Sequence, residues 1–263
     1  MTSAYLLVSH GSRDPRPQQE VDQLAQLLCQ KLENYQSQLL GVTKVGTLPV
    51  AHPGAIAIAT AYQPLVATAC LELAPEPLHR QIENFGKKAL AAGLNRLKVL
   101  PLFLLPGVHV MEDIPGEVAI AQQTFGEELT IEIRPHLGTH PGMRELFAKQ
   151  MADFDGDAWI LLSHGSRREG GNQPVEALAA HLGAFPAFWS VHPKLEFQVK
   201  ALLMAGYRQI GILPYFLFGG GITDAIARSV TEISQEFPAV NFYLAKPLGA
   251  SVELTDLILD LAK

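Results

Sequence analysis

The chain carries the same two motifs twice, in the same order. Residues 5–13 read YLLVSHGSR and residues 159–167 read WILLSHGSR, so each copy is an apolar run that stops at His-Gly-Ser-Arg. A second pair follows, VLPLFLLPG at 99–107 and ILPYFLFGG at 212–220. Because a repeated set of motifs marks a repeated structural unit, the chain is expected to fold as two similar halves.

The order of the predicted elements indicates an α/β fold. Short apolar runs alternate with stretches of helical periodicity throughout the chain. Strands are expected at 4–9, 66–73, 97–105 and 129–135, and again at 158–163, 187–191, 209–218 and 240–245. This alternation predicts two similar lobes, each a parallel sheet flanked by helices.

We place the lobes at residues 1–153 and 154–263. Residues 41–64 match nothing in the second half and are read as an insertion or a long loop.

Composition limits the classes of protein to which the chain can belong. Hydrophobic residues make up 48% and charged residues 17% of the chain, which is typical of a protein with an ample core. The formal net charge of −6 argues against a general nucleic-acid binder, which would be basic. Neither a membrane span nor a leader segment is recognised, and Cys29 and Cys70 are isolated. We therefore expect a cytoplasmic protein with no membrane or nucleic-acid partner, and a monomer, because the duplicated chain can build a two-lobed cleft by itself.

Two histidines follow predicted strands of the first half. His10 comes directly after the first strand and His109 follows the third, after the Pro-Gly break at 106–107. A lone histidine is usually a core residue, but ligands of parallel sheets bind at the carboxyl ends of the strands, where both of these lie. The second half keeps His164 but has Ile222 in place of His109. This loss predicts one working site, in the first half, with His164 as a structural relic or a distal wall of the same cleft.

Glu72 is the carboxylate that stands out near these histidines. It follows a predicted buried strand, where a charged side chain is rare unless it has a partner or a function. Either it forms a structural pair with a cationic group, or it lies just past the strand and faces the same cleft as His10 and His109. Two imidazoles and one carboxylate are typical ligands of Zn²⁺, Fe²⁺, Co²⁺ or Ni²⁺, and three protein ligands leave positions open for exchange.

Other polar residues are given more ordinary roles. Asp113 is expected to cap a helix, and His136 and His140 to line a pocket wall. A hydrolase that uses Ser12 or Ser166 is a minor alternative, because the Gly-x-Ser-x-Gly nucleophile motif is missing.

Three motifs in order resemble a known family. SHGSR at 9–13, CLELA at 70–74 and PLFLLPGVH at 101–109, followed by EDIP at 112–115, are similar to the class II chelatases. More narrowly, they resemble the sirohydrochlorin cobaltochelatases and ferrochelatases. The resemblance implies that a divalent metal is inserted into a tetrapyrrole in a cleft between two α/β lobes. It also implies that His10 and His109 bind the metal or accept pyrrole protons, that Glu72 assists, and that the site lies in the N-terminal lobe.

The resemblance sets the expected ligands and partners. Co²⁺, Fe²⁺ or Ni²⁺ is a substrate, no cofactor is permanently bound, and the choice between cobalt and iron stays open. Sirohydrochlorin carries carboxylates around its rim, so the residues expected to bind it include Arg13 and Arg16. The remaining residues assigned to substrate binding are Ser12, Gly107 and His140. The alternative function is a non-catalytic carrier of metal or tetrapyrrole that uses the same ligands.

Overall fold

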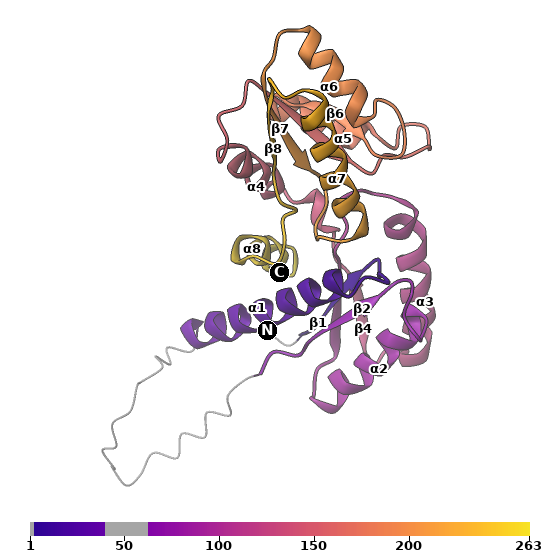
Figure 1. Ribbon diagram of the computed structural model, residues 1–263. Helices are drawn as coiled ribbons and strands as arrows, with labels where there is room; N and C mark the ends of the chain where they lie inside the picture. The colour runs from indigo at the N-terminus through magenta and orange to yellow at the C-terminus, as the bar shows by residue number, and fades with distance from the viewer. Residues whose placement is uncertain (1–2, 40–62) are drawn as a thin grey trace, which may run out of the picture.

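The structure, a computed structural model, describes residues 3–39 and 63–263 and shows two lobes, one above the other in Figure 1. Each lobe is built on a four-stranded parallel sheet. The first lobe contains β1 (Ser3–Ser9), α1 (Pro15–Leu39), β2 (Val66–Cys70), α2 (Leu78–Ala91), β3 (Arg96–Pro101), the π-helical turn η1 (His109–Asp113), α3 (Ile114–Phe125) and β4 (Thr130–Ile133). The short 3₁₀ helix η2 (Leu137–Thr139) and α4 (Gly142–Met151) lead to the second lobe.

The second lobe repeats the first. It contains β5 (Ala158–Ser163), α5 (Gln173–Leu182), β6 (Phe185–Phe188), α6 (Leu195–Met204), β7 (Gln209–Pro214), α7 (Gly221–Glu236), β8 (Asn241–Leu244) and α8 (Val252–Leu261). The strand orders, β2-β1-β3-β4 and β6-β5-β7-β8, are the same, so the first strand of each half lies inside its sheet. The expected α/β fold with two similar lobes is confirmed.

The central strands are apolar because both of their faces are covered. In β1, Leu6 and Val8 pack against α2 and α3, whereas Tyr5 and Leu7 face a core that both lobes share. β5 alternates in the same way, with Trp159 among the residues of the shared core. A parallel strand buried on both faces reads as the continuous apolar run seen in each repeated motif.

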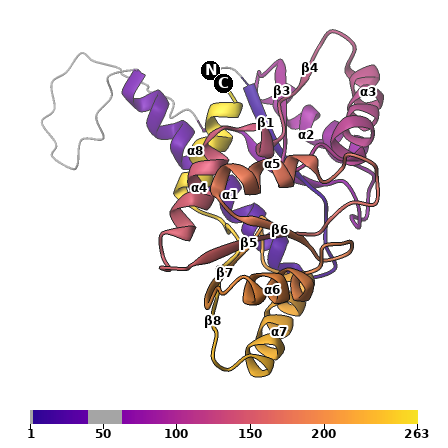
Figure 2. The same cartoon turned by 90° about the horizontal axis from the view of Figure 1, so that it is seen from above.

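The last helix of each half packs on the other half. α8 lies beside α1 of the first lobe in both views, and α4 contacts β7 of the second lobe (Figures 1 and 2). Lys98 of β3 is buried and donates to the carbonyl oxygens of Ala262 and Lys263, at 2.7 and 3.2 Å. The division between residues 153 and 154 separates the two sheets, but it stays a prediction as a boundary between domains.

The order of the elements follows the sequence, but β2, β3 and β7 end at Cys70, Pro101 and Pro214, three or four residues before the ends expected at 73, 105 and 218. β6 begins two residues before the strand expected at 187, and η1 was not expected. The insertion placed at 41–64 lies almost entirely outside the described residues. Within the described ranges, no helix combines the length and the hydropathy needed to span a bilayer.

Candidate metal centre

His10 is presented by a tight turn at the carboxyl end of β1. The turn depends on Gly11, which has a φ of +96° and where a Cβ would lie 2.0 Å from the carbonyl oxygen of Glu72. Only glycine fits this conformation and this close approach without strain. The Nδ1 of His10 lies 3.2 Å from the carbonyl oxygen of Gly11. Because a carbonyl can only accept, this contact places a proton on Nδ1 and leaves Nε2 facing the cluster.

Glu72 is held opposite His10 by backbone hydrogen bonds. The pairing of β1 with β2 continues past both strands, with Leu71 N–H donating to Ser9 and Glu72 N–H donating to the carbonyl of His10, each at 2.9 Å. Glu72 is exposed, and its Oε2 lies 3.8 Å from the Nε2 of His10. Of the two interpretations of Glu72, the structure supports the one in which the side chain lies just past the strand and faces the histidines.

His109 begins η1, and its orientation is fixed by Asp113. The Nδ1 of His109 lies 2.7 Å from Oδ2 of Asp113, one wide helical turn later. The expected capping role of Asp113 is wrong, since its side chain makes no capping hydrogen bond. The reason is that α3 continues directly from η1, so that Ile114 N–H already donates to the carbonyl of His109. The carboxylate is therefore available to the imidazole, and the Nε2 of His109 is left free.

The three side chains converge. The rings of His10 and His109 have centroids 4.8 Å apart and meet edge to face at 79°. One potential ligand atom from each of His10, Glu72 and His109 lies within 4.8 Å of the other two. Two ligand atoms that are each ~2.1 Å from an ion lie at most ~4.2 Å apart, so movements of less than ~1 Å would bring all three onto one ion.

A strongly acidic cavity of about 470 Å³ adjoins this cluster. Glu72, Glu112, Asp113 and Glu117 line it, and none of the lining residues that the structure describes is basic. Glu117 is engaged by His79, whose Nδ1 lies 2.9 Å from its Oε2. The remaining carboxylates make this side of the first lobe attractive to cations.

Three of the residues assigned to substrate binding follow His10, with Ser12 and Arg13 in the turn and Arg16 at the start of α1. The Oγ of Ser12 accepts from Asp14 N–H at 3.0 Å, and Arg13 is exposed with no side-chain partner in the described part of the chain. Arg16 instead bridges the lobes, since it donates to Asp14 and to Asp224 of α7, at 3.0 Å each for the bonds to their Oδ1 atoms. The hydrogen bonds from Arg16 lower the pKa of Asp14 to about 2. The charge of Arg16 is thus compensated by two carboxylates, whereas Arg13 is free to meet an anion.

Gly107 and His140 differ in their surroundings. Gly107 is exposed, and a Cβ there would meet nothing within 4 Å. The Nδ1 of His140 accepts from Gly142 N–H at 3.0 Å, and its Nε2 lies 3.1 Å from Oδ2 of Asp260 on α8. Through its two ring nitrogens, His140 therefore links the start of α4 to α8. It lines a cavity as expected, but not the one beside Glu72. The assignment of these residues to substrate binding stays a prediction.

The second lobe keeps the backbone frame of the site, meaning the strand ends and the hydrogen bond between them, but it lacks two of the three ligand side chains. Ser190 N–H donates to the carbonyl of His164 at 2.9 Å, as Glu72 N–H does to His10. Ser190 therefore stands where the first lobe has its carboxylate, and Ile222, one residue into α7, stands in place of His109. Within residues 3–39 and 63–263, the first lobe holds the one cluster of three such ligands.

Sequence reasoning missed the partner of His109 and the counterpart of Glu72. The spacing of Asp113 from His109, four residues, was a usable signal, because such pairs meet on one face of a helix. No signal in the sequence identified Ser190, because the connection from β1 to β2 and the connection from β5 to β6 differ in length.

Comparison with known families shows to which family the chain belongs. The CbiX family model matches it twice, over residues 55–154 and 158–263. The chain belongs to the CbiX family. The two matches correspond to the two lobes of this CbiX protein, although the first begins after β1 and His10.

Relatives of this CbiX protein carry chelatase names. It is 24% identical to the sirohydrochlorin ferrochelatase of Priestia megaterium over 199 residues, covering 71% of this chain and 72% of the relative. It is 22% identical to the sirohydrochlorin cobaltochelatase of the same organism over 215 residues, covering 76% and 69%. The structure of SirB from Bacillus subtilis with Fe³⁺ matches at a TM-score of 0.71 and 22% identity, covering 100% of this chain and 94% of SirB, which shows a shared fold. The resemblance to the chelatases is confirmed.

Proposed function

We propose that this CbiX protein inserts a divalent metal ion, Co²⁺ or Fe²⁺, into sirohydrochlorin, with His10, Glu72 and His109 as ligands of the incoming ion. The observation that carries the proposal is the convergence of their ligand atoms within 4.8 Å at the carboxyl edge of one sheet. The two curated relatives, named as a sirohydrochlorin ferrochelatase and a sirohydrochlorin cobaltochelatase, support the substrate.

The protonation of the imidazoles suits an ion that must arrive and leave. The Nδ1 atoms of His10 and His109 are engaged by the Gly11 carbonyl and the Asp113 carboxylate, which leaves both Nε2 lone pairs for the ion. Three protein ligands leave coordination positions open to water and then to pyrrole nitrogens. The acidic cavity beside Glu72 raises the local concentration of cations where the ion enters.

The same atoms can complete the proton balance. Metal insertion releases two protons from the inner pyrrole nitrogens, and transfer of the ion to the macrocycle vacates two Nε2 lone pairs. Each vacated Nε2 can then accept one of those protons, and an imidazole ordinarily titrates near neutral pH. The hydrogen bond to Asp113 stabilises the imidazolium that forms on His109.

Peripheral carboxylates of the substrate require cationic partners. Arg13, exposed beside His10 and free of a carboxylate partner in the described part of the chain, supplies one. Its replacement by alanine is expected to raise the KM for sirohydrochlorin and to leave kcat nearly unchanged. An unchanged KM would remove this role.

Multiple turnover tests the function itself. Sirohydrochlorin and Co²⁺ or Fe²⁺, kept anaerobic and mixed with a catalytic amount of protein, should shift to the absorption spectrum of the metallated product many times per protein molecule. A change that stops at one equivalent would instead identify a carrier. His10→Ala and His109→Ala should each lower kcat by about 10²-fold or more, because each removes both a ligand and a proton acceptor. A double variant with parental turnover would refute the assignment.

A further inference from the structure

A larger cavity, of about 690 Å³, lies between the two lobes and shares no residue with the metal-ligand cluster or with the acidic cavity. Its walls come from both halves of the chain: Leu104, His136 and Arg144 belong to the first half, and Leu178, His181 and Tyr215 to the second. A ligand in this cavity would therefore contact both lobes.

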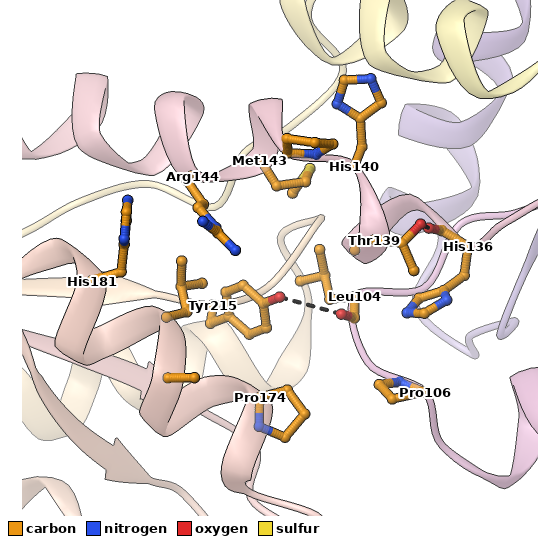
Figure 3. A pocket seen from close by; sticks show the side chains of 14 residues that line it. Leu104, Pro106, His136, Thr139, His140, Met143, Arg144, Pro174, His181 and Tyr215 are labelled. Atoms are coloured by element: carbon orange, nitrogen blue, oxygen red, sulfur yellow. Dashed lines mark hydrogen bonds between the residues drawn. The ribbon is translucent and has the colours of Figure 1, made fainter.

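The charge of the cavity is opposite to the charge of the chain. Among the described residues, no aspartate or glutamate lines it, although the chain has a net charge of −6. Arg144 of α4 and His181 of α5 are both exposed, and neither side chain has a hydrogen bond or ion pair within the described residues. In Figure 3 the two side chains lie next to each other on the wall formed by these helices. A free guanidinium beside an imidazole favours an anion.

His136 adds a polar group to the wall of the cavity. Its residue is only 9% exposed, and its ring makes no hydrogen bond within the described chain. Burial lowers its pKa, so the ring is neutral and offers one N–H donor and one acceptor. Its ring nitrogens are not enclosed by protein atoms, so they can bond to water or to a ligand in the cavity.

Apolar side chains form much of the remaining wall, which also includes Thr139 and His140. Leu104, Pro106, Met143 and Leu178 line it. The hydroxyl of Tyr215 donates to the carbonyl of Leu104 at 3.2 Å, so that the two lobes are joined within the wall itself (Figure 3). A site with apolar walls and a few converging polar groups is typical of a small-molecule pocket.

We propose that this interlobe cavity binds an organic anion, a carboxylate carried on an apolar ring, with Arg144 and His181 at the anionic group and Leu104, Met143 and Leu178 around the ring. Two sources share this chemistry: a free small acid, and a peripheral arm of the tetrapyrrole.

Binding of 8-anilinonaphthalene-1-sulfonate, an aromatic anion that fluoresces in apolar sites, tests the proposal with the full chain. We expect saturable binding to the wild type and a Kd raised about tenfold or more in Arg144→Gln or His181→Gln, because each loses a charge-assisted contact. Arg228→Gln, at an exposed position on α7, is the control for a lost positive charge.

A second pair of variants is independent of charge. Ala177 lines the cavity and Ala180 does not, although both are exposed on α5. Ala177→Phe should block the probe, and Ala180→Phe should leave its Kd unchanged, with thermal melts verifying that both variants are folded. Absence of saturable binding to the wild type, or a Kd that neither Arg144→Gln nor Ala177→Phe alters, would overturn the proposal.

The KM for sirohydrochlorin separates the two sources. If Arg144→Gln weakens the probe and leaves this KM unchanged, the ligand is a free acid. If it also raises this KM, the ligand is an arm of the macrocycle. Both results support the site, and neither depends on which residues hold the metal.

Discussion

Glu72 and Ser190 occupy equivalent places in the two lobes, since the backbone N–H of each donates at 2.9 Å to the carbonyl of the histidine that directly follows the neighbouring strand. In the first lobe this position carries a carboxylate that faces His10 and His109. In the second lobe the Oγ of Ser190 instead donates to the carbonyl of His164 at 2.8 Å. The backbone frame of a metal centre is thus present twice, and the side chains decide which copy can hold an ion.

Rebuilding the second copy is therefore a direct test. The double change Ser190→Glu with Ile222→His should raise the number of Co²⁺ ions bound per chain from one to two, because it restores three ligands around His164. Isothermal titration with Co²⁺ measures the stoichiometry. Ser190→Glu alone is the control and should stay at one ion. If the double variant, like the control, binds only one ion per chain, the two backbone frames are not equivalent.

Asp113 should control metal affinity without touching the metal. Asp113→Ala leaves the Nδ1 of His109 without the acceptor now 2.7 Å away, so that neither the ring orientation nor the position of its proton is fixed. The affinity for Co²⁺ is expected to fall by about 10- to 100-fold. Glu112→Gln, at an exposed neighbouring position of the same turn, is the control and should change affinity much less. Equal losses in the two variants would indicate a general effect of negative charge.

Gly11→Ala should destabilise the first lobe. The new Cβ would lie 2.0 Å from the carbonyl oxygen of Glu72, at a φ of +96°. The free energy of unfolding is expected to fall by about 1–3 kcal/mol or more, measured by urea denaturation. Gly107→Ala is the matched control, since a Cβ there meets nothing within 4 Å, and it should change this free energy by less than about 0.5 kcal/mol. Similar losses in both variants would contradict the close contact.

The ion pairs that Arg16 forms with Asp14 and Asp224 should persist at acidic pH. Hydrogen bonds from Arg16 lower the pKa of Asp14 from 3.8 to about 2 and also lower the pKa of Asp224. Because the folded-state pKa is the lower one, the stabilisation is fully present above pH 3.8 and is lost as the pH falls towards 2. A titration of the Asp14 carboxyl by NMR should show the low value in the wild type and a value near 3.8 in Arg16→Gln. An ordinary pKa in the wild type would mean that the pair is open in solution.

Local sequence accounts for much of this structure. The repeated motifs and the alternation of apolar runs with helical periodicity predicted two similar parallel sheets, because these patterns depend on neighbouring residues and on burial of both strand faces. The convergence of His10 and His109 was predictable for a related reason. The two residues follow strands whose carboxyl ends share one edge of a sheet, so position along the chain was enough to bring them together.

Contacts between distant segments were decided by the tertiary structure. Arg16 was expected to meet the substrate, yet it meets Asp224, and His140 is joined to Asp260 by the exchange of α4 and α8 between the lobes. The interlobe cavity exists because of how these helices pack. No periodicity or motif encodes such pairings, because they depend on which surfaces two separately predictable halves turn towards each other. The sequence by itself determined the two sheets and the edge where an ion can bind, and the packing of one lobe on the other determined which of the remaining charges are free to bind a ligand.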